Sequence, residues 1–138
     1  MTIHQEVTIA ASPAAVYGVL TSSTDFAKMT GGRAAKISGE VGGTFSMFGG
    51  DIEGRNVELV PGKRVVQAWR SKAWPEGVYS IVRFELARDG KGTKLTFDQA
   101  GHPDGAREML EGGWHQMYWQ PMNALFSGKP VSATMSDM

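Results

Sequence analysis

The stretch GGWHQMYWQPMNALF, residues 112–126, carries large apolar residues at helical spacing. Counted from residue 114 they fall at i, i+3, i+4, i+7, i+8 and i+11, which places them on one face of an α-helix. They are Trp114, Met117, Tyr118, Pro121, Met122 and Leu125. The periodicity runs from Asp104 to Phe126. It therefore predicts a helix of more than about 30 Å, long enough to cross a whole sheet.

The predicted helix contains residues that oppose regular helix formation. Gly112 and Gly113 precede its aromatic part, and Pro121 lies inside it. Proline removes one helical N–H, so we expect a bend near Met117. Gly113 is expected to let a neighbouring backbone approach closely.

The first 32 residues predict one strand and two short helices. Residues 3–11 alternate between apolar and polar positions, with Gln5 as the exception on the apolar side. Ser12 and Pro13 suit the cap and first turn of a helix, which should bury Val16, Val19 and Leu20. A second helix, in STDFAKMTGG at 23–32, should be capped by Ser23 or Thr24 and bury Phe26 and Met29.

From Glu40 the hydrophobic period changes to two, which predicts five or six further strands. PGK at 61–63 and DGKG at 89–92 are typical hairpin turns, so consecutive strands should pair antiparallel. Several strand faces combine an apolar body with one polar residue: Gln67, Ser80 or Gln99. A curved antiparallel sheet needs a cover, and only the C-terminal helix is long enough to provide it. The predicted fold class is therefore α+β, a curved antiparallel sheet wrapped around residues 104–126.

Composition limits the classes of function. A chain of 138 residues predicts one domain, residues 1–127, with a loose tail at 128–138. Fourteen basic and fourteen acidic residues balance, which argues against a nucleic-acid partner. Cysteine is absent, which excludes disulfides and thiolate metal sites. No signal peptide or membrane-spanning apolar run is visible, so we expect a cytoplasmic protein without membrane insertion.

Aromatic, methionine and scattered polar residues on the two facing surfaces are typical of a small-molecule pocket, although an ordinary core would use many of the same residues. The pocket hypothesis predicts a small hydrophobic or aromatic ligand, no cofactor and no catalysis. Ser80 and Gln99 would orient the ligand. The predicted lining residues are Phe45, Met47, Trp69, Ser80, Val82, Phe84, Phe97, Gln99, Trp114, Met117, Tyr118 and Met122.

Catalytic motifs are sparse. The three histidines lack metal-ligand spacing, and no Gly-x-Ser-x-Gly elbow is present. Asp51 and Glu53, in GGDIEG between two strands, could be paired carboxylates at a pocket rim or simply turn residues. His102 lies in AGHPDG at the helix entrance, where an acid–base role or a plain loop position are both open.

Several residues outside the predicted pocket suggest other contacts. Trp74, in SKAWPEG, could contact a partner, cover the pocket or pack inward. Tyr79 and Ile81 lie on the outer face of their strand, which hints at a homodimer. Strand parity directs Arg70 and Arg83 away from the cavity, onto an exposed face.

The chain resembles the START-like helix-grip superfamily, in the branch named for the activator of the heat-shock-protein-90 ATPase, stand-alone bacterial form. The resemblance covers residues 3–126 and rests on four stretches in order: IAASPAAVYGVLTS, GEVGGTFSMFGGDIEGRNVELVPGKRVVQAWR, GTKLTFDQAGHP and GGWHQMYWQPMNALF. It implies a helix-grip fold with a cavity between the sheet and the long helix. It does not imply a reaction, because this superfamily uses one fold for ligand carriage, sequestration, cyclisation and co-chaperone work.

Three functional hypotheses follow from the residues and the resemblance. The first is binding of a small hydrophobic molecule in the cavity. The second is a co-chaperone-like domain that acts on heat-shock protein 90. The third is a cyclase or hydrolase that uses Asp51, Glu53 or His102, which requires at least one of them to face the cavity.

Overall fold

The computed structural model describes residues 2–127, and the tail expected at 128–138 lies outside them. The elements are, in order, β1 (Thr2–Ile9), α1 (Pro13–Thr21), α2 (Ser23–Met29), β2 (Lys36–Ile37), β3 (Thr44–Met47), η1 (Phe48–Gly50), β4 (Ile52–Val60), β5 (Arg64–Ser71), β6 (Ser80–Asp89), β7 (Gly92–Ala100), η2 (Asp104–Ala106), α3 (Arg107–Trp114), η3 (His115–Trp119) and α4 (Gln120–Phe126). Within residues 2–127, no helix combines the length and the apolar character needed to span a membrane. The cytoplasmic location stays a prediction.

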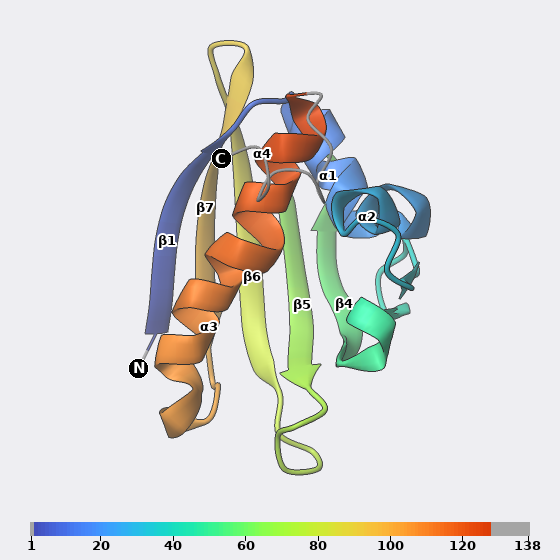
Figure 1. The fold of residues 1–138 in the computed structure, drawn as a ribbon, viewed down its shortest axis with the longest axis vertical. Helices are drawn as coiled ribbons and strands as arrows, with labels where there is room; N and C mark the ends of the chain where they lie inside the picture. The colour runs from blue at the N-terminus through green and yellow to red at the C-terminus, as the bar shows by residue number, and fades with distance from the viewer. Residues whose placement is uncertain (1, 128–138) are drawn as a thin grey trace.

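The strands form one seven-stranded antiparallel sheet in the order β1-β7-β6-β5-β4-β3-β2. The helical segment from α3 to α4 crosses one face of this sheet (Figure 1). α1 and α2 lie beside the C-terminal end of that helical segment, next to α4. The predicted α+β architecture is therefore confirmed. The turns at PGK and DGKG are confirmed too, because Gly62 and Gly90 take positive φ values of 72° and 62° between paired strands.

The N-terminal elements follow the sequence signals with one correction. Ser12 caps α1 by accepting a hydrogen bond from the Ala15 N–H. The cap of α2 is Ser22, not Ser23 or Thr24, and it accepts from the Asp25 N–H. The Ser23 hydroxyl instead bonds the backbone of Ile37, which ties α2 to β2.

Gln5, the polar exception in β1, faces the long helix. Its side-chain oxygen accepts a hydrogen bond of 2.7 Å from the Trp119 indole, and its amide donates to the Glu111 carbonyl. A glutamine on this apolar face therefore satisfies an indole N–H and joins the first strand to the helix.

The C-terminal helix changes its winding in the middle. η3, residues His115–Trp119, is a π-helical turn between α3 and α4. The sequence predicts a bend near Met117, and the structure has a π turn at this place. Donors in a π turn reach carbonyls five residues back, so the chain can pass Pro121 without the N–H that proline lacks.

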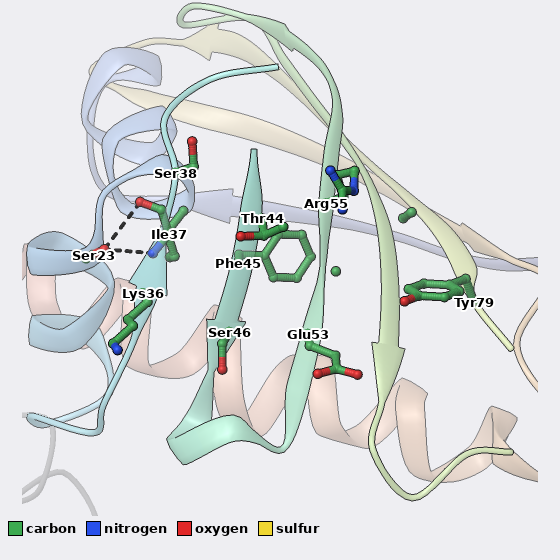
Figure 2. A pocket seen from close by; sticks show the side chains of 12 residues that line it. Ser23, Lys36, Ile37, Ser38, Thr44, Phe45, Ser46, Glu53, Arg55 and Tyr79 are labelled. Carbon is green, nitrogen blue, oxygen red and sulfur yellow. Dashed lines mark hydrogen bonds between the residues drawn. The ribbon is translucent and has the colours of Figure 1, made fainter. Parts of the chain in front are cut away.

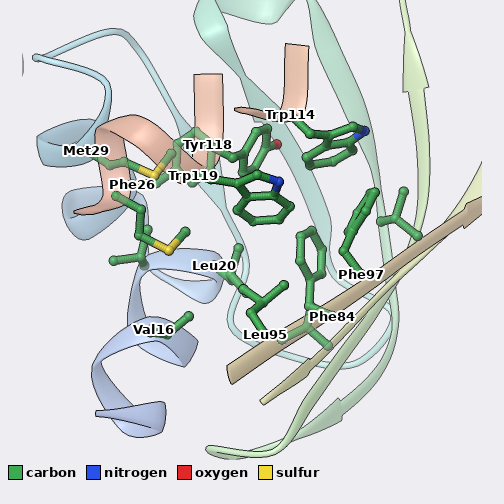
Figure 3. Packing of buried hydrophobic residues seen from close by; sticks show 14 of the residues in the cluster. Val16, Leu20, Phe26, Met29, Phe84, Leu95, Phe97, Trp114, Tyr118 and Trp119 are labelled. Atoms are coloured by element: carbon green, nitrogen blue, oxygen red, sulfur yellow. The ribbon is translucent and has the colours of Figure 1, made fainter. Parts of the chain in front are cut away.

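The π turn adds one residue and rotates the face that follows it. Tyr118 and Trp119 are therefore both buried, with Trp119 only 2% exposed, whereas Met117 is 38% exposed. The prediction that Met117 belongs to the buried face is wrong for this reason, and Trp119 was missed. Figure 3 shows Trp119 beside Tyr118, facing Phe84 of the sheet.

Close backbone approach occurs at glycines other than the expected one. A Cβ at Gly113 would meet no atom within 4 Å, so its predicted packing role is wrong. A Cβ at Gly54 would instead overlap the Ala68 carbonyl oxygen. Only glycine fits there, because the backbones of β4 and β5 approach each other closely at this point.

Candidate ligand-binding cleft

A cleft of about 520 Å³ lies between the long helix and the end of the sheet where β5 finishes. The loops at residues 72–79 and 101–106 and the turn η1 contribute lining residues. In Figure 1 these segments lie in the lower half of the molecule. Most of its lining is apolar, contributed by Phe48, Ile52, Trp69, Trp74, Pro75, Pro103, Ala106, Met109, Leu110, Gly113, Trp114, Met117 and Tyr118. Its volume lies in the range of small-molecule sites.

Trp69 is at the centre of the aromatic lining. Its ring centroid lies 5.7 Å from that of Trp74 and 5.1 Å from that of Trp114. Tyr118 follows on the other side of Trp114, at 4.3 Å between centroids. Three indoles and a phenol thus form a continuous wall from the loop to the core, and Trp74 packs inward on Trp69.

The loop that carries Trp74 is held by Arg70. The Arg70 guanidinium donates to the carbonyls of Trp74, Pro75 and Val78 at 2.9, 3.2 and 3.2 Å and pairs with Glu53 at 2.7 Å. The arginine points away from the cleft, as expected, but its side chain is only 9% exposed. The expected exposure is therefore wrong, because the loop folds back over the outer face of β5.

η1 supplies the opposite side of the cleft through Phe48. Phe48 has a φ of 54°, a left-handed conformation that is unusual for a bulky residue. Its ring packs edge-on against Phe26 and Tyr118 at 5.5 and 5.7 Å, and the Arg33 guanidinium lies 5.1 Å from its centroid. Two aromatic rings and one guanidinium pack around Phe48, so the ring is held in place at the cleft.

Gly113 keeps the cleft open from the helix side. It lines the cleft, and the space where a side chain would stand is empty. A Cβ at Gly112, its neighbour, would also meet no atom within 4 Å, but Gly112 does not line the cleft. The functional consequence of the Gly-Gly pair is therefore confined to Gly113.

The predicted lining residues divide into three groups. Trp69, Trp114, Met117 and Tyr118 line the cleft. Phe45 lines a different hollow, on the other side of β3 and β4. The remainder are buried in the core: Met47, Ser80, Val82, Phe84, Phe97, Gln99 and Met122. Phe48, Ile52, Leu110 and the loop prolines were missed, because their positions depend on how loops fold over the end of the sheet.

Ser80 and Gln99 use their hydrogen-bonding groups within the protein. The Trp114 indole donates to the Gln99 side-chain oxygen at 2.8 Å, and the Gln99 amide donates to the Ser80 hydroxyl at 3.0 Å. The Ser80 hydroxyl donates in turn to the Trp69 carbonyl at 2.8 Å. This chain of bonds fixes Trp114 against the sheet and so shapes the cleft.

The candidate catalytic residues do not come together. Asp51 lines the cleft at its rim, 4.0 Å from Arg33, with its side chain 79% exposed. Glu53 lies within β4, not in a turn, and pairs with Arg70 on the outer face. His102 is buried, donates through Nδ1 to the Pro103 carbonyl, and is not a lining residue. The rim therefore holds one solvated carboxylate, and the expected carboxylate pair is not formed.

A second hollow, of about 910 Å³, lies over β2, β3 and β4 (Figure 2). Many of its lining groups are polar and already engaged: Ser23 bonds Ile37, and Arg55 donates to the Gly42 carbonyl. Thr44, Lys36 and Arg55 are exposed there. It is larger than the cleft, but a polar, solvent-facing lining gives an apolar ligand little to bury against.

Burial raises the pKa of the Tyr118 phenol well above its ordinary value, and a hydrogen-bonding contact from the Trp69 indole to the phenol oxygen lowers it by a smaller amount. A phenol is protonated at neutral pH even at its ordinary pKa, so the hydroxyl is available as a donor.

Residues 10–127 match the family model described as Activator of Hsp90 ATPase homolog 1-like protein. The chain belongs to this family. Activator of 90 kDa heat shock protein ATPase homolog 1 from Homo sapiens is 29% identical over 119 residues, which are 86% of this chain and 35% of the human protein. The chain thus spans about a third of the length of the curated relatives that it matches over most of its residues.

Solved structures share the whole fold. An HSP90 activator from Plasmodium falciparum superposes with a TM-score of 0.84 and 25% identity, over 94% of this chain and 98% of that one. The Aha1 dimer from Colwellia psychrerythraea gives a TM-score of 0.79 with 23% identity, over 94% and 98%. The helix-grip fold implied by the sequence resemblance is therefore confirmed.

Proposed function

We propose that this member of the Activator of Hsp90 ATPase homolog 1-like family binds a small hydrophobic or aromatic molecule in the cleft around Trp69. The observation that carries the proposal is the aromatic wall of Trp74, Trp69, Trp114 and Tyr118, which borders about 520 Å³ of open space. Flat apolar molecules gain both area burial and ring contacts against such a wall.

The rim has the properties of an adaptable entrance. Met109 is 81% exposed and Met117 is 38% exposed, and both line the cleft. Exposed methionines adjust their shape at low cost and are common at sites that bind apolar partners. No catalytic step is assigned, because the single carboxylate at the rim, Asp51, lacks an acid–base partner in the cleft lining.

Filling the cleft from Gly113 tests the proposal. Gly113→Leu places a side chain in the cleft, whereas Gly112→Leu makes the same change on the same helix outside it. We expect native mass spectrometry of protein from its own host to show a bound small molecule on the wild type and on Gly112→Leu, and none on Gly113→Leu. Equal occupancy of the two variants, or a ligand-free wild type that also fails to bind naphthalene-sized aromatics, would contradict the proposal.

A second candidate function is an interaction with heat-shock protein 90. Two relatives support it: the Homo sapiens protein is named as an activator of the 90 kDa heat shock protein ATPase, and the Plasmodium falciparum protein as an HSP90 activator. Co-purification with the host's heat-shock protein 90 tests it, and absence of enrichment counts against it. This candidate is independent of the cleft, so Gly113→Leu should leave such an interaction unchanged.

A homodimer is supported by the dimeric Colwellia psychrerythraea structure and by two half-exposed apolar residues on the outer sheet face, Tyr79 and Ile81. Light scattering at two concentrations distinguishes monomer from dimer. Ile81→Lys should dissociate a dimer that uses this face.

A further inference from the structure

The three buried indoles of the core differ in how their N–H groups are satisfied. Trp114 donates to Gln99 at 2.8 Å and Trp119 donates to Gln5 at 2.7 Å. Trp69 is only 4% exposed, yet its Nε1 makes no hydrogen bond of good geometry among residues 2–127, and the polar group beside it is the Tyr118 hydroxyl. A buried donor without an acceptor is costly, so an unpartnered indole in a lined cleft points to a ligand acceptor.

Tyr118 provides a second donor beside Trp69. Within the described part of the chain its hydroxyl donates only to the Met47 sulfur, at 4.0 Å, which is a weak acceptor, and the Trp69 indole beside it is another donor. Trp69 and Tyr118 flank the same ring, that of Trp114, at 5.1 and 4.3 Å between centroids. Both residues line the cleft. Two donors that lack a strong acceptor therefore lie side by side in its wall.

We propose that the ligand is a flat aromatic molecule with a carbonyl oxygen, and that this oxygen accepts hydrogen bonds from Trp69 Nε1 and the Tyr118 hydroxyl. This inference rests on the proposed function of the cleft and specifies the ligand's chemistry. The ligand's ring system stacks on the indole wall, and its carbonyl oxygen lies at the inner end of that wall. Both donors keep their protons at neutral pH, because a phenol has an ordinary pKa of about 10 and an indole N–H is a donor only.

The charges around the cleft favour a neutral oxygen over a carboxylate. Arg33 is the cation that lines the cleft, and it lies at the rim, 45% exposed, near Asp51 and over the Phe48 ring. A carboxylate at the inner end would be buried without a cation, at a cost far above that of a carbonyl. An amine or ammonium group would place donors against donors.

His102 Nε2, the other buried atom without a partner among residues 2–127, does not belong to this site. His102 is absent from the cleft lining, and its Nδ1 bonds the Pro103 carbonyl at 3.0 Å. The two-donor site therefore consists of Trp69 and Tyr118.

A cycle of two ligands and two proteins tests the inference. The ligands are 2-acetylnaphthalene and 2-ethylnaphthalene, which share the ring system and differ in the carbonyl. The proteins are the wild type and Tyr118→Phe, with Tyr17→Phe as a control that removes a hydroxyl in α1, outside the cleft. Dissociation constants come from equilibrium dialysis, and the cycle cancels the different hydration of the two ligands.

We expect Tyr118→Phe to weaken the ketone by about five- to tenfold, as for loss of one neutral hydrogen bond, and to leave the hydrocarbon unchanged. Tyr17→Phe should change neither. Replacing residue 69 by β-(3-benzothienyl)alanine, which keeps the ring shape without the N–H, should have the same selective effect. The infrared stretch of the bound ¹³C-labelled carbonyl should move to higher wavenumber in each of these two cleft variants.

The outcomes separate this inference from the proposed function. If Tyr118→Phe affects both ligands equally or neither, while Gly113→Leu abolishes binding of both, the cleft binds apolar molecules but the two-donor site is wrong. If the wild type binds neither ligand, the inference and the proposed binding of flat aromatics are both overturned.

Discussion

The Trp114 indole N–H donates a 2.8 Å hydrogen bond to the side-chain oxygen of Gln99, inside the core. This bond joins the long helix to β7 at the point where both residues are buried. Because Gln99 also bonds Ser80, a polar group in the middle of the sheet is fully used to position an aromatic ring. The core here contributes orientation as well as burial.

Gln99→Leu should destabilise the protein by about 2–3 kcal/mol, because it leaves the Trp114 N–H buried without an acceptor and removes a donor to Ser80. Chemical denaturation measures the free energy of unfolding. Gln116→Leu is the control, since Gln116 is exposed on η3 and should change stability by less than about 0.5 kcal/mol. Equal effects of the two substitutions on the free energy of unfolding would show that the buried hydrogen bond contributes no net stability.

Replacing glycine by alanine should change stability in opposite directions at Gly112 and Gly54, because their surroundings differ. Gly112→Ala should stabilise the protein by about 1 kcal/mol, because a methyl group there meets open space and improves helix propensity. Gly54→Ala should destabilise it by about 3 kcal/mol or more, because the methyl group overlaps the Ala68 carbonyl. Thermal unfolding of both variants provides the comparison. A stable Gly54→Ala variant would mean that β4 and β5 separate easily at this point.

The sequence predicted the layers of this fold because period and turn chemistry are local. Alternation in β1, the PGK and DGKG turns and the Ser12 cap each act over a few residues, and each is confirmed. The predictions that proved wrong concern residues whose positions depend on non-local geometry. Trp119 became a core residue because a π turn changed the helical phase, and Ser22 replaced its neighbours as cap because Ser23 bonds β2.

The cleft was harder to predict than the fold, since loops from distant parts of the chain complete it. Trp69, Trp114 and Tyr118 were recoverable from strand parity and helical spacing. Phe48 was not, because it faces the cleft through a left-handed backbone that no propensity rule predicts for phenylalanine. The unpaired N–H of Trp69 becomes visible only once every neighbour has been placed.

A cross-strand charge network on the outer face should make stability depend on pH. The hydrogen bond from His4 to Asp98, at 2.7 Å, is the largest cause of a raised His4 pKa, and Glu6 adds to it. The contribution is therefore fully present below pH 6.5, the ordinary pKa, and is lost as pH rises through the raised value. Unfolding free energies of wild type and His4→Gln should differ in slope across that window.

His115→Gln is the control for the histidine prediction, because His115 is exposed on η3 and makes no ion pair within residues 2–127. It should leave the pH dependence of the wild type unchanged. A wild-type profile that stays parallel to that of His4→Gln from pH 5 to 8 would show that the His4–Asp98 contact is not maintained in solution.

Loss of Arg70 should release the loop that carries Trp74. The guanidinium bonds three carbonyls of residues 74–78 and the Glu53 carboxylate, and its side chain is 9% exposed. Arg70→Met removes all of these bonds but keeps the apolar stem, so we expect about 3 kcal/mol of destabilisation and faster amide exchange at residues 72–79.

Arg83→Met is the control. It breaks an exposed pair with Asp98, so it should cost less than about 1 kcal/mol and leave amide exchange in the Trp74 loop unchanged. Hydrogen exchange measured by mass spectrometry distinguishes the two. Unchanged protection of the loop in Arg70→Met would mean that the packing of Trp74 on Trp69, at 5.7 Å between centroids, is sufficient to hold it closed.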